Sequence, residues 1–192
     1  MKGHKKKSSR IFKAIEVATK AHAGQFRKGT SLPYILHPLG VGRILIEYDF
    51  PEEVVIAGIL HDTIEDTSVT LKDILKFFGR NVKRIVEGVS EPNRSDTWKI
   101  RKQHTIDYLK TASIDVLLVT CADKLDNIKA IKEDYNKIGD ALWKRFNAKK
   151  DKQEWYYKSL ARSFLGRSKE RIGVSLFKEF SNEVKLVFKG AE

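Results

Sequence analysis

The sequence contains little cysteine, methionine or proline, and it has no long apolar run. Of its 192 residues, one is cysteine, one is methionine and four are proline. The single cysteine, Cys121, cannot form a disulfide within the chain, which is typical of proteins in a reducing compartment. Every apolar stretch is too short to cross a bilayer. No apolar segment follows the basic N-terminus "MKGHKKKSSR" to make a secretory signal. These absences favour a cytoplasmic protein with no membrane partner.

Negative charge is also scarce relative to positive charge. The chain carries 37 Lys and Arg against 25 Asp and Glu, a formal net charge of +12 at pH 7. Such an excess favours an anionic partner such as a nucleotide or a nucleic acid, although a well-solvated surface would show it too. Because several of the basic residues lie at the start of the chain, we expect residues 1–10 to be a basic flexible leader.

Apolar residues recur with a helical period through almost the whole chain. The stretch "RIFKAIEVATKAHAG" repeats them every three or four positions, and "TLKDILKFFG" has Thr70 as an N-cap and Gly79 as a terminator. The β-branched start of "IDVLLVTCADKLDNIKAI" would suit a strand, but a strand needs a partner and we find no second candidate. We therefore predict a buried helix from Ile114 to about Ile131.

The expected fold is thus all-α. We divide it into a single helical bundle over residues 11–165 and a C-terminal helical extension over residues 166–192. The stretch "GRSKER" at the start of the extension is the candidate hinge between them.

Polar side chains follow directly on one apolar run. After "VVIAGIL", the stretch "HDTIED" contains His61, Asp62, Glu65 and Asp66. Residues four apart share a face of a helix, so one helix would pair His61 with Glu65 and Asp62 with Asp66. Acids at a helix C-terminus are unfavourable to its dipole, which argues against a merely structural role. The adjacent His and Asp can reach one point beside the helix and form part of a metal site.

Two other segments offer the ligands that an adjacent His and Asp cannot supply alone. "PYILHP" contains His37, and "CADKLDN" contains Asp123 inside an apolar run. A carboxylate in such a run needs a cation or a hydrogen-bond partner, and the structural alternative is an ion pair with Lys124. We expect nearby Asp126 to face solvent. Two imidazoles and two carboxylates together suit Mn²⁺, Fe²⁺ or Zn²⁺.

The segments "HPLGV", "HDTIED" and "ADKLDN", in this order, resemble the HD superfamily of metal-dependent phosphohydrolases. More narrowly, "AHAGQFRKG" and "LPYILHP" ahead of "GILHDTIEDT" resemble the hydrolase domains of RelA/SpoT homologues and the stand-alone small alarmone hydrolases. The resemblance covers roughly residues 11–165. It implies that the helical bundle is a single HD domain.

The resemblance also implies a role for particular residues. One Mn²⁺ would be bound by His37, His61, Asp62 and Asp123. The attacking water would be positioned and activated by Glu65 and Asp66. The nucleotide would be contacted by Arg27, Lys28 and Asn127. The implied activity is that of a guanosine-3′,5′-bis(diphosphate) 3′-pyrophosphohydrolase, which converts (p)ppGpp to GDP or GTP and pyrophosphate. Fe²⁺ and Zn²⁺ are the alternative metals.

Two other functions stay open at this point. The first is an HD phosphohydrolase acting on another nucleotide, such as an adenine alarmone, NADPH or a nucleoside monophosphate. The second, more remote, is a basic helical nucleic-acid-binding module. The chain lacks a groove-reading or base-stacking motif, so we expect no specific nucleic-acid partner. The sequence leaves the base preference, the physiological metal and a homo-oligomer open.

Overall fold

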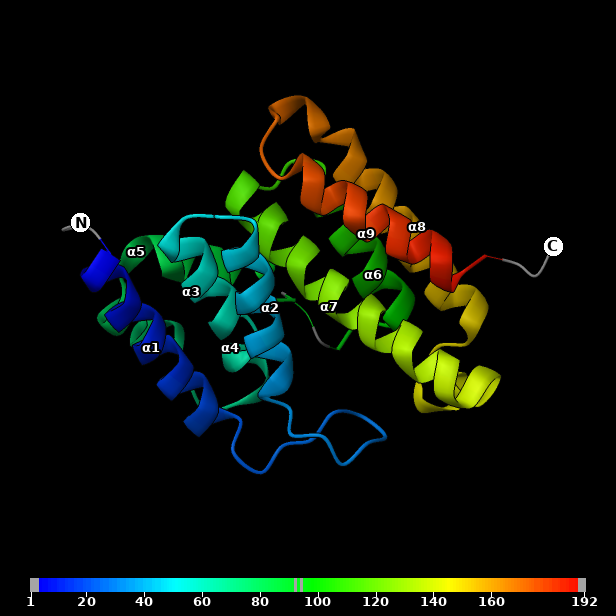
Figure 1. Cartoon of the computed structure of the whole chain (residues 1–192), viewed down its shortest axis with the longest axis horizontal. Helices are drawn as coiled ribbons and strands as arrows, with labels where there is room; N and C mark the ends of the chain where they lie inside the picture. Colours follow the sequence, from blue (N-terminus) through cyan, green and yellow to red (C-terminus); the bar gives the residue numbers. More distant parts are fainter. Residues whose placement is uncertain (1–3, 92, 94, 190–192) are drawn as a thin grey trace.

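The computed structural model describes residues 4–91, 93 and 95–189, and the regular secondary structure of these residues is almost entirely helical. The helices, shown in Figure 1, are α1 (His4–Ala21), α2 (Leu36–Glu47), α3 (Glu52–Leu60), α4 (Thr63–Asp66), α5 (Leu71–Val89), α6 (Trp98–Tyr108), α7 (Ile114–Ile138), α8 (Lys150–Gly166) and α9 (Val174–Val187). Two short 3₁₀ turns, Gly139–Arg145 and Ser168–Glu170, flank α8. Within the described ranges the β-structure amounts to one bridge between Phe26 and Pro33. The predicted all-α fold is confirmed.

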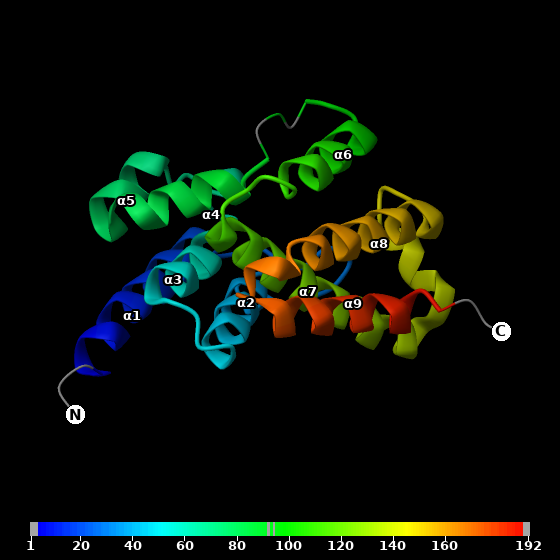
Figure 2. The ribbon, with the colours of Figure 1, turned by 90° about the horizontal axis from the view of Figure 1, so that it is seen from above.

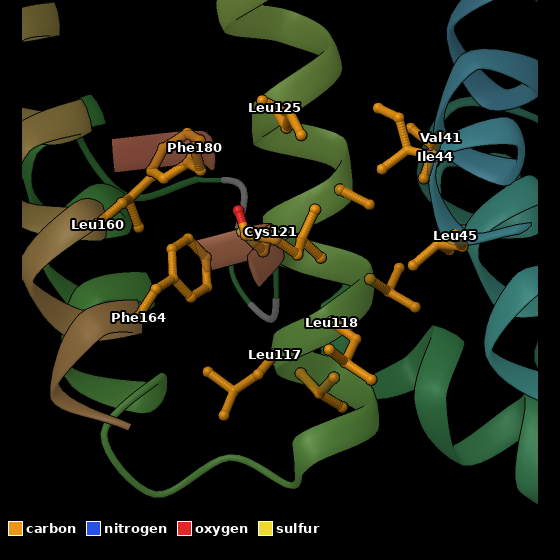
Figure 3. Close-up of a cluster of buried hydrophobic side chains, with 14 of the residues drawn as sticks. Val41, Ile44, Leu45, Leu117, Leu118, Cys121, Leu125, Leu160, Phe164 and Phe180 are labelled. Atoms are coloured by element: carbon orange, nitrogen blue, oxygen red, sulfur yellow. The ribbon is translucent and has the colours of Figure 1, made fainter. Parts of the chain in front are cut away.

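Helix α7 is the central element of the core. Residues 116–123 are all buried, as expected of a helix that is surrounded on every side. Figure 3 shows α7 between two apolar layers, with Val41 and Leu45 of α2 on one side and Phe164 and Phe180 on the other. The β-branched run therefore forms the predicted buried helix and not a strand. In this position α7 can carry a polar side chain into the middle of the molecule.

Helices α2 and α3 cross at short distance because each has a glycine at the contact. A Cβ atom at Gly42 would lie 2.6 Å from Ile59 Cγ1, and one at Gly58 would lie 2.3 Å from Leu45 Cδ1. The two helices follow each other through a short turn, so the start of α2 lies beside the end of α3. This arrangement brings the rings of His37 and His61 to a centroid separation of 5.1 Å.

Helix α1 begins inside the segment 1–10, and the flexibility expected of that segment stays a prediction from the sequence. Helix α1 already begins at His4, and residues 1–3 lie outside the described part of the chain. Lysine and arginine are good helix formers, so a run of them can extend a helix that packing stabilises further along. Arg10 supplies part of that packing, since its guanidinium donates to Glu52 at 2.8 Å and to the Phe78 carbonyl at 3.0 Å.

Helix α5 begins where its sequence predicts, but it continues beyond the predicted terminator Gly79 to Val89. Thr70 and Asp73 form a reciprocal capping box at its start. Gly79 has a φ of 88°, in the left-handed region, and kinks the helix where the first segment was expected to end. Figure 2 shows α5 and α6 on one side of the molecule and α9 on the opposite side.

Helix α9 is part of the same hydrophobic core as α7 and α8. Its side chains Leu176, Phe177 and Phe180 are fully buried. Ion pairs of 2.6 Å from Lys129 to Glu179 and 2.5 Å from Lys132 to Glu183 link α7 to α9. The candidate hinge therefore connects two packed helices. Within the part of the chain that is described, no helix combines the length and the apolar character needed to span a membrane.

Candidate metal centre

Four side chains from three separated segments meet beside the middle of α7. His37 comes from the first turn of α2, His61 and Asp62 from the junction between α3 and α4, and Asp123 from α7. We call these four residues the candidate metal centre. His37, His61 and Asp123 are buried, and their ligand atoms all lie within 4.8 Å of one another.

The junction between α3 and α4 corrects one expectation from the sequence. Residues 51–66 do not form one continuous helix, because α3 ends at Leu60 and α4 starts at Thr63. Asp62 has a ψ of −7°, which turns the chain between the two helices. The turn brings the side chains of His61 and Asp62 together, and His61 Nε2 lies 3.0 Å from Asp62 Oδ2. The same carboxylate oxygen lies 3.7 Å from His37 Nε2.

The hydrogen bonds of the two imidazoles leave both Nε2 atoms for a metal. His61 Nδ1 lies 2.8 Å from the Gly58 carbonyl oxygen, which can only accept, so Nδ1 carries the hydrogen. His61 Nε2 is buried and has no hydrogen-bond partner among the described residues. His37 Nδ1 lies 2.6 Å from Asp126 Oδ2, and its Nε2 lies 3.2 Å from Asp123 Oδ1. A buried nitrogen lone pair facing carboxylates fits a divalent cation.

Asp126 does not face solvent, and that expectation was wrong. Its carboxylate accepts the hydrogen bond from His37 Nδ1, the arrangement that orients metal-binding histidines in many proteins. Gly40 makes room for this contact, since a Cβ atom there would lie 2.1 Å from Asp126 Oδ1. The three-residue spacing from Asp123 to Asp126 could have indicated this contact, because residues three apart share a helix face.

Tyr34 is a further contributor that the sequence reasoning missed. Its hydroxyl donates to Asp62 Oδ2 at 2.5 Å, the carboxylate oxygen nearest to both histidines. The ring packs against His22 at a centroid distance of 4.9 Å, and burial beside Asp62 raises the pKa of the Tyr34 hydroxyl. Tyr34 therefore stays protonated and fixes one oxygen of the Asp62 carboxylate.

The Asp123 carboxylate lies next to a lysine side chain. Lys124 Nζ lies 2.7 Å from Asp123 Oδ2, so the ion pair considered as a structural alternative exists beside the candidate metal centre. Burial opposes ionisation of Asp123, but Lys124, His37 and His61 together outweigh it and hold the pKa of the carboxyl well below its usual range. Burial also disfavours protonation of His61, but the Asp62 carboxylate raises the pKa of that imidazole to about 9. Protons therefore compete with a metal for His61.

Comparison with known proteins places the chain in a family. The model of the HD domain family matches residues 14–151. The chain belongs to the HD domain family. The HD fold and the buried His–Asp cluster together indicate a divalent metal site in this chain.

One curated relative of this HD domain, from Aquifex aeolicus, is called guanosine-3′,5′-bis(diphosphate) 3′-pyrophosphohydrolase. It is 39% identical over 126 residues, which cover 63% of this chain and 18% of the relative. The chain spans about a fifth of the length of the first curated relatives it matches.

Two solved structures are similar to most of this chain. The crystal structure of lmo0812 from Listeria monocytogenes EGD-e is 37% identical, with a TM-score of 0.74, and the match covers 80% of this chain and 99% of that one. A metazoan ortholog of SpoT, described as hydrolysing ppGpp, gives a TM-score of 0.73 over 94% of both chains. At 24% identity this second likeness shows the fold.

Two cavities adjoin the candidate metal centre of this HD domain, and both are lined by Asp62, Lys102, Asp123, Lys124 and Tyr156. The Arg27 cavity has a volume of 430 Å³ and is lined by Arg27, Lys28 and Asn127 beside three of the centre's residues. Arg27 donates to Asn127 Oδ1 at 3.1 Å, and Asn127 donates to Asp123 Oδ1 at 2.6 Å. Lys28 points to Asn147 at 2.6 Å and is exposed. The three residues expected to contact a nucleotide thus share one cavity.

The second cavity, which we call the α6 cavity, has a volume of 480 Å³ and lies between α5, α6 and α7. Glu65 lines it, and its Oε1 accepts a hydrogen bond from the Glu91 backbone N–H at 3.0 Å. Asp66 is exposed and lines neither cavity beside the candidate metal centre, and its backbone carbonyl accepts a hydrogen bond from Gln25 at 2.8 Å. Glu65 therefore shares the α6 cavity with His61, Asp62 and Asp123, and Asp66 does not line that cavity.

Proposed function

We propose that this HD domain is a metal-dependent hydrolase that removes the 3′-pyrophosphate of (p)ppGpp-type nucleotides. The observation that carries the proposal is the convergence of His37, His61, Asp62 and Asp123 beside two cavities that both contain Lys and Arg side chains. The name of the Aquifex relative supports the choice of substrate. The nucleotide is the proposed partner, and the cytoplasm is the proposed location.

The proposed metal is Mn²⁺, bound by the four residues of the candidate metal centre. A mixed set of imidazole nitrogens and carboxylate oxygens suits Mn²⁺, with Fe²⁺ and Zn²⁺ as alternatives. When bound, such a metal lowers the pKa of water and polarises a phosphoryl oxygen.

Glu65 is the proposed general base. Its carboxylate lines the α6 cavity beside Asp62 and Asp123, where it can accept the proton of the attacking water. The water oxygen forms a bond to the phosphorus nearest the ribose, and the bond from that phosphorus to the 3′-oxygen breaks. The 3′-oxygen takes up a proton, so the products are a nucleotide with a free 3′-hydroxyl and pyrophosphate. An orienting role for Asp66 stays a prediction from the sequence.

The Arg27 cavity is the proposed nucleoside side of the site. Arg27 offers a planar fork of donors to phosphate or base oxygens, and Lys28 offers a point charge at the rim. Asn127 joins Arg27 to Asp123, so a nucleotide bound here is held next to the candidate metal centre.

The test is a turnover assay of the purified chain with Mn²⁺ against a panel of nucleotides. The panel contains (p)ppGpp, an adenine alarmone, NADPH and nucleoside monophosphates. We expect pyrophosphate release from (p)ppGpp, and loss of both metal binding and turnover in Asp62→Ala with the helical circular dichroism retained. Release of orthophosphate alone, or turnover confined to another nucleotide, would reject the proposed substrate.

A further inference from the structure

The α6 cavity extends from the candidate metal centre to a group of cations that the steps above do not use. Arg101 and Lys102 of α6 and Lys124 of α7 line it together with His61 and Asp123. The side chains of Arg101 and Lys102 are only 24% and 18% exposed. Arg101 Nε is buried without a hydrogen-bond partner among the described residues. Positive charge is thus held inside the cavity and is not simply displayed on the surface.

Glu91 lies between the first two of these cations. Lys102 Nζ lies 2.6 Å from Glu91 Oε1, and the Arg101 guanidinium donates to Glu91 Oε2. Lys124 is paired with Asp123, whose carboxylate belongs to the candidate metal centre. The cavity is also lined by Asp62, Glu65 and Glu87, so a metal at Asp62 and Asp123 would offset part of its negative charge and leave Arg101 and Lys102 paired with Glu91. A carboxylate and a phosphate present the same kind of acceptor oxygens to Arg and Lys.

We propose that Arg101 and Lys102 bind the terminal phosphate of the pyrophosphate group, and that the Glu91 carboxylate competes with that phosphate for both cations. The inference rests on the proposed function, which puts the phosphorus nearest the ribose at the candidate metal centre. The nucleoside then lies in the Arg27 cavity, and the second phosphate extends into the α6 cavity.

Glu91 is also connected to the proposed base, but through its backbone. Its N–H donates to Glu65 Oε1, while its carboxylate pairs with the two cations. A change of the Glu91 side chain therefore alters the competition for the cations without removing the backbone contact to Glu65. The isosteric change Glu91→Gln removes the negative charge and keeps the shape of the side chain.

The experiment is calorimetric titration of inorganic pyrophosphate into the full-length chain, with the same Mn²⁺ concentration in cell and syringe. We expect Glu91→Gln to bind pyrophosphate about tenfold more tightly, a difference of about 1.4 kcal/mol. We expect Lys102→Gln to bind it at least about tenfold more weakly, because a charge-assisted hydrogen bond is lost. Unchanged or weaker binding by Glu91→Gln would overturn the proposal, as it would show that Glu91 only holds Arg101 and Lys102 in place.

Glu87→Gln is the matched control. Glu87 lines the same cavity and makes an exposed pair with Lys83 at 3.0 Å, so the variant has the same charge change without the contact to α6. Its pyrophosphate affinity should stay within about twofold of the unmodified chain, because exposed pairs contribute little. An equal gain in both variants would mean a general charge effect and would reject the role of Glu91.

A parallel turnover assay with (p)ppGpp separates the two proposals. Turnover without the affinity gain in Glu91→Gln would reject this inference alone. The affinity gain without turnover of (p)ppGpp would reject the proposed substrate and leave a pyrophosphate-binding site at Arg101 and Lys102.

Discussion

Replacing Gly40 with alanine should weaken metal binding while leaving the fold intact. The new Cβ atom would lie 2.1 Å from Asp126 Oδ1, so the Asp126 carboxylate has to turn away. The turn removes the acceptor that holds His37 Nδ1 at 2.6 Å. Loss of such a partner typically lowers metal affinity 10–100-fold, or by about 1.4–2.8 kcal/mol. The free energy of unfolding without metal should change by no more than about 1 kcal/mol, because the better helix propensity of alanine offsets the lost hydrogen bond.

The measurement is calorimetric titration with Mn²⁺, beside chemical denaturation of the metal-free protein. Gly42→Ala is the matched control on the same helix. Its Cβ atom would lie 2.6 Å from Ile59 Cγ1, in the apolar contact with α3. It should lower the free energy of unfolding by about 1–3 kcal/mol through overpacking. Because Asp126 can keep its contact with His37 in this variant, the loss of Mn²⁺ affinity should be smaller than in Gly40→Ala. If Gly40→Ala bound Mn²⁺ as tightly as the unmodified chain, the role given to Asp126 would be refuted.

Three further outcomes are expected. Glu65→Gln should keep its metal content by elemental analysis and lose about 10²–10⁴-fold in kcat, and a retained kcat would exclude Glu65 as the base. Tyr34→Phe should bind Mn²⁺ several-fold more weakly in calorimetry, since the hydrogen bond to Asp62 contributes about 1 kcal/mol; equal affinity would show that the contact does not matter. Because the pKa of His61 is raised to about 9, metal binding at neutral pH displaces a proton. Metal affinity should therefore rise with pH and level off above about pH 9, and a flat profile from pH 6 to 9 would contradict this.

Much of the fold could be predicted because its signals are local. The period of the apolar residues and the capping box at Thr70 are read within one helix. The buried segment of α7 could be assigned as a helix because no partner strand was found. The break at His61 and Asp62 could not be predicted, since the periodicity continues across it and the turn depends on the fit of α3 against α2.

The same distinction between local signals and long-range packing applies to the candidate site. Its four proposed metal ligands stand in segments whose order resembles a known family, and the structure brings them together. The roles of Tyr34, Gly40 and Asp126 depend on contacts between helices far apart in the sequence. Asp126 in particular looks like an ordinary surface acid until α2 is packed against α7. Such residues support the ligands without a recognisable motif of their own.

The position of the four proposed ligands has a consequence for the stability of the whole protein. They extend from His37 to Asp123 in a chain of 192 residues, so a bound ion would act as a reversible cross-link between α2, the α3–α4 junction and α7. An ion that binds the native state and not the unfolded chain raises the melting temperature in proportion to the logarithm of its concentration. Removal of the ion by a chelator would then lower the stability of the fold as well as abolish turnover. The concentration of the free ion would set the melting temperature of the protein.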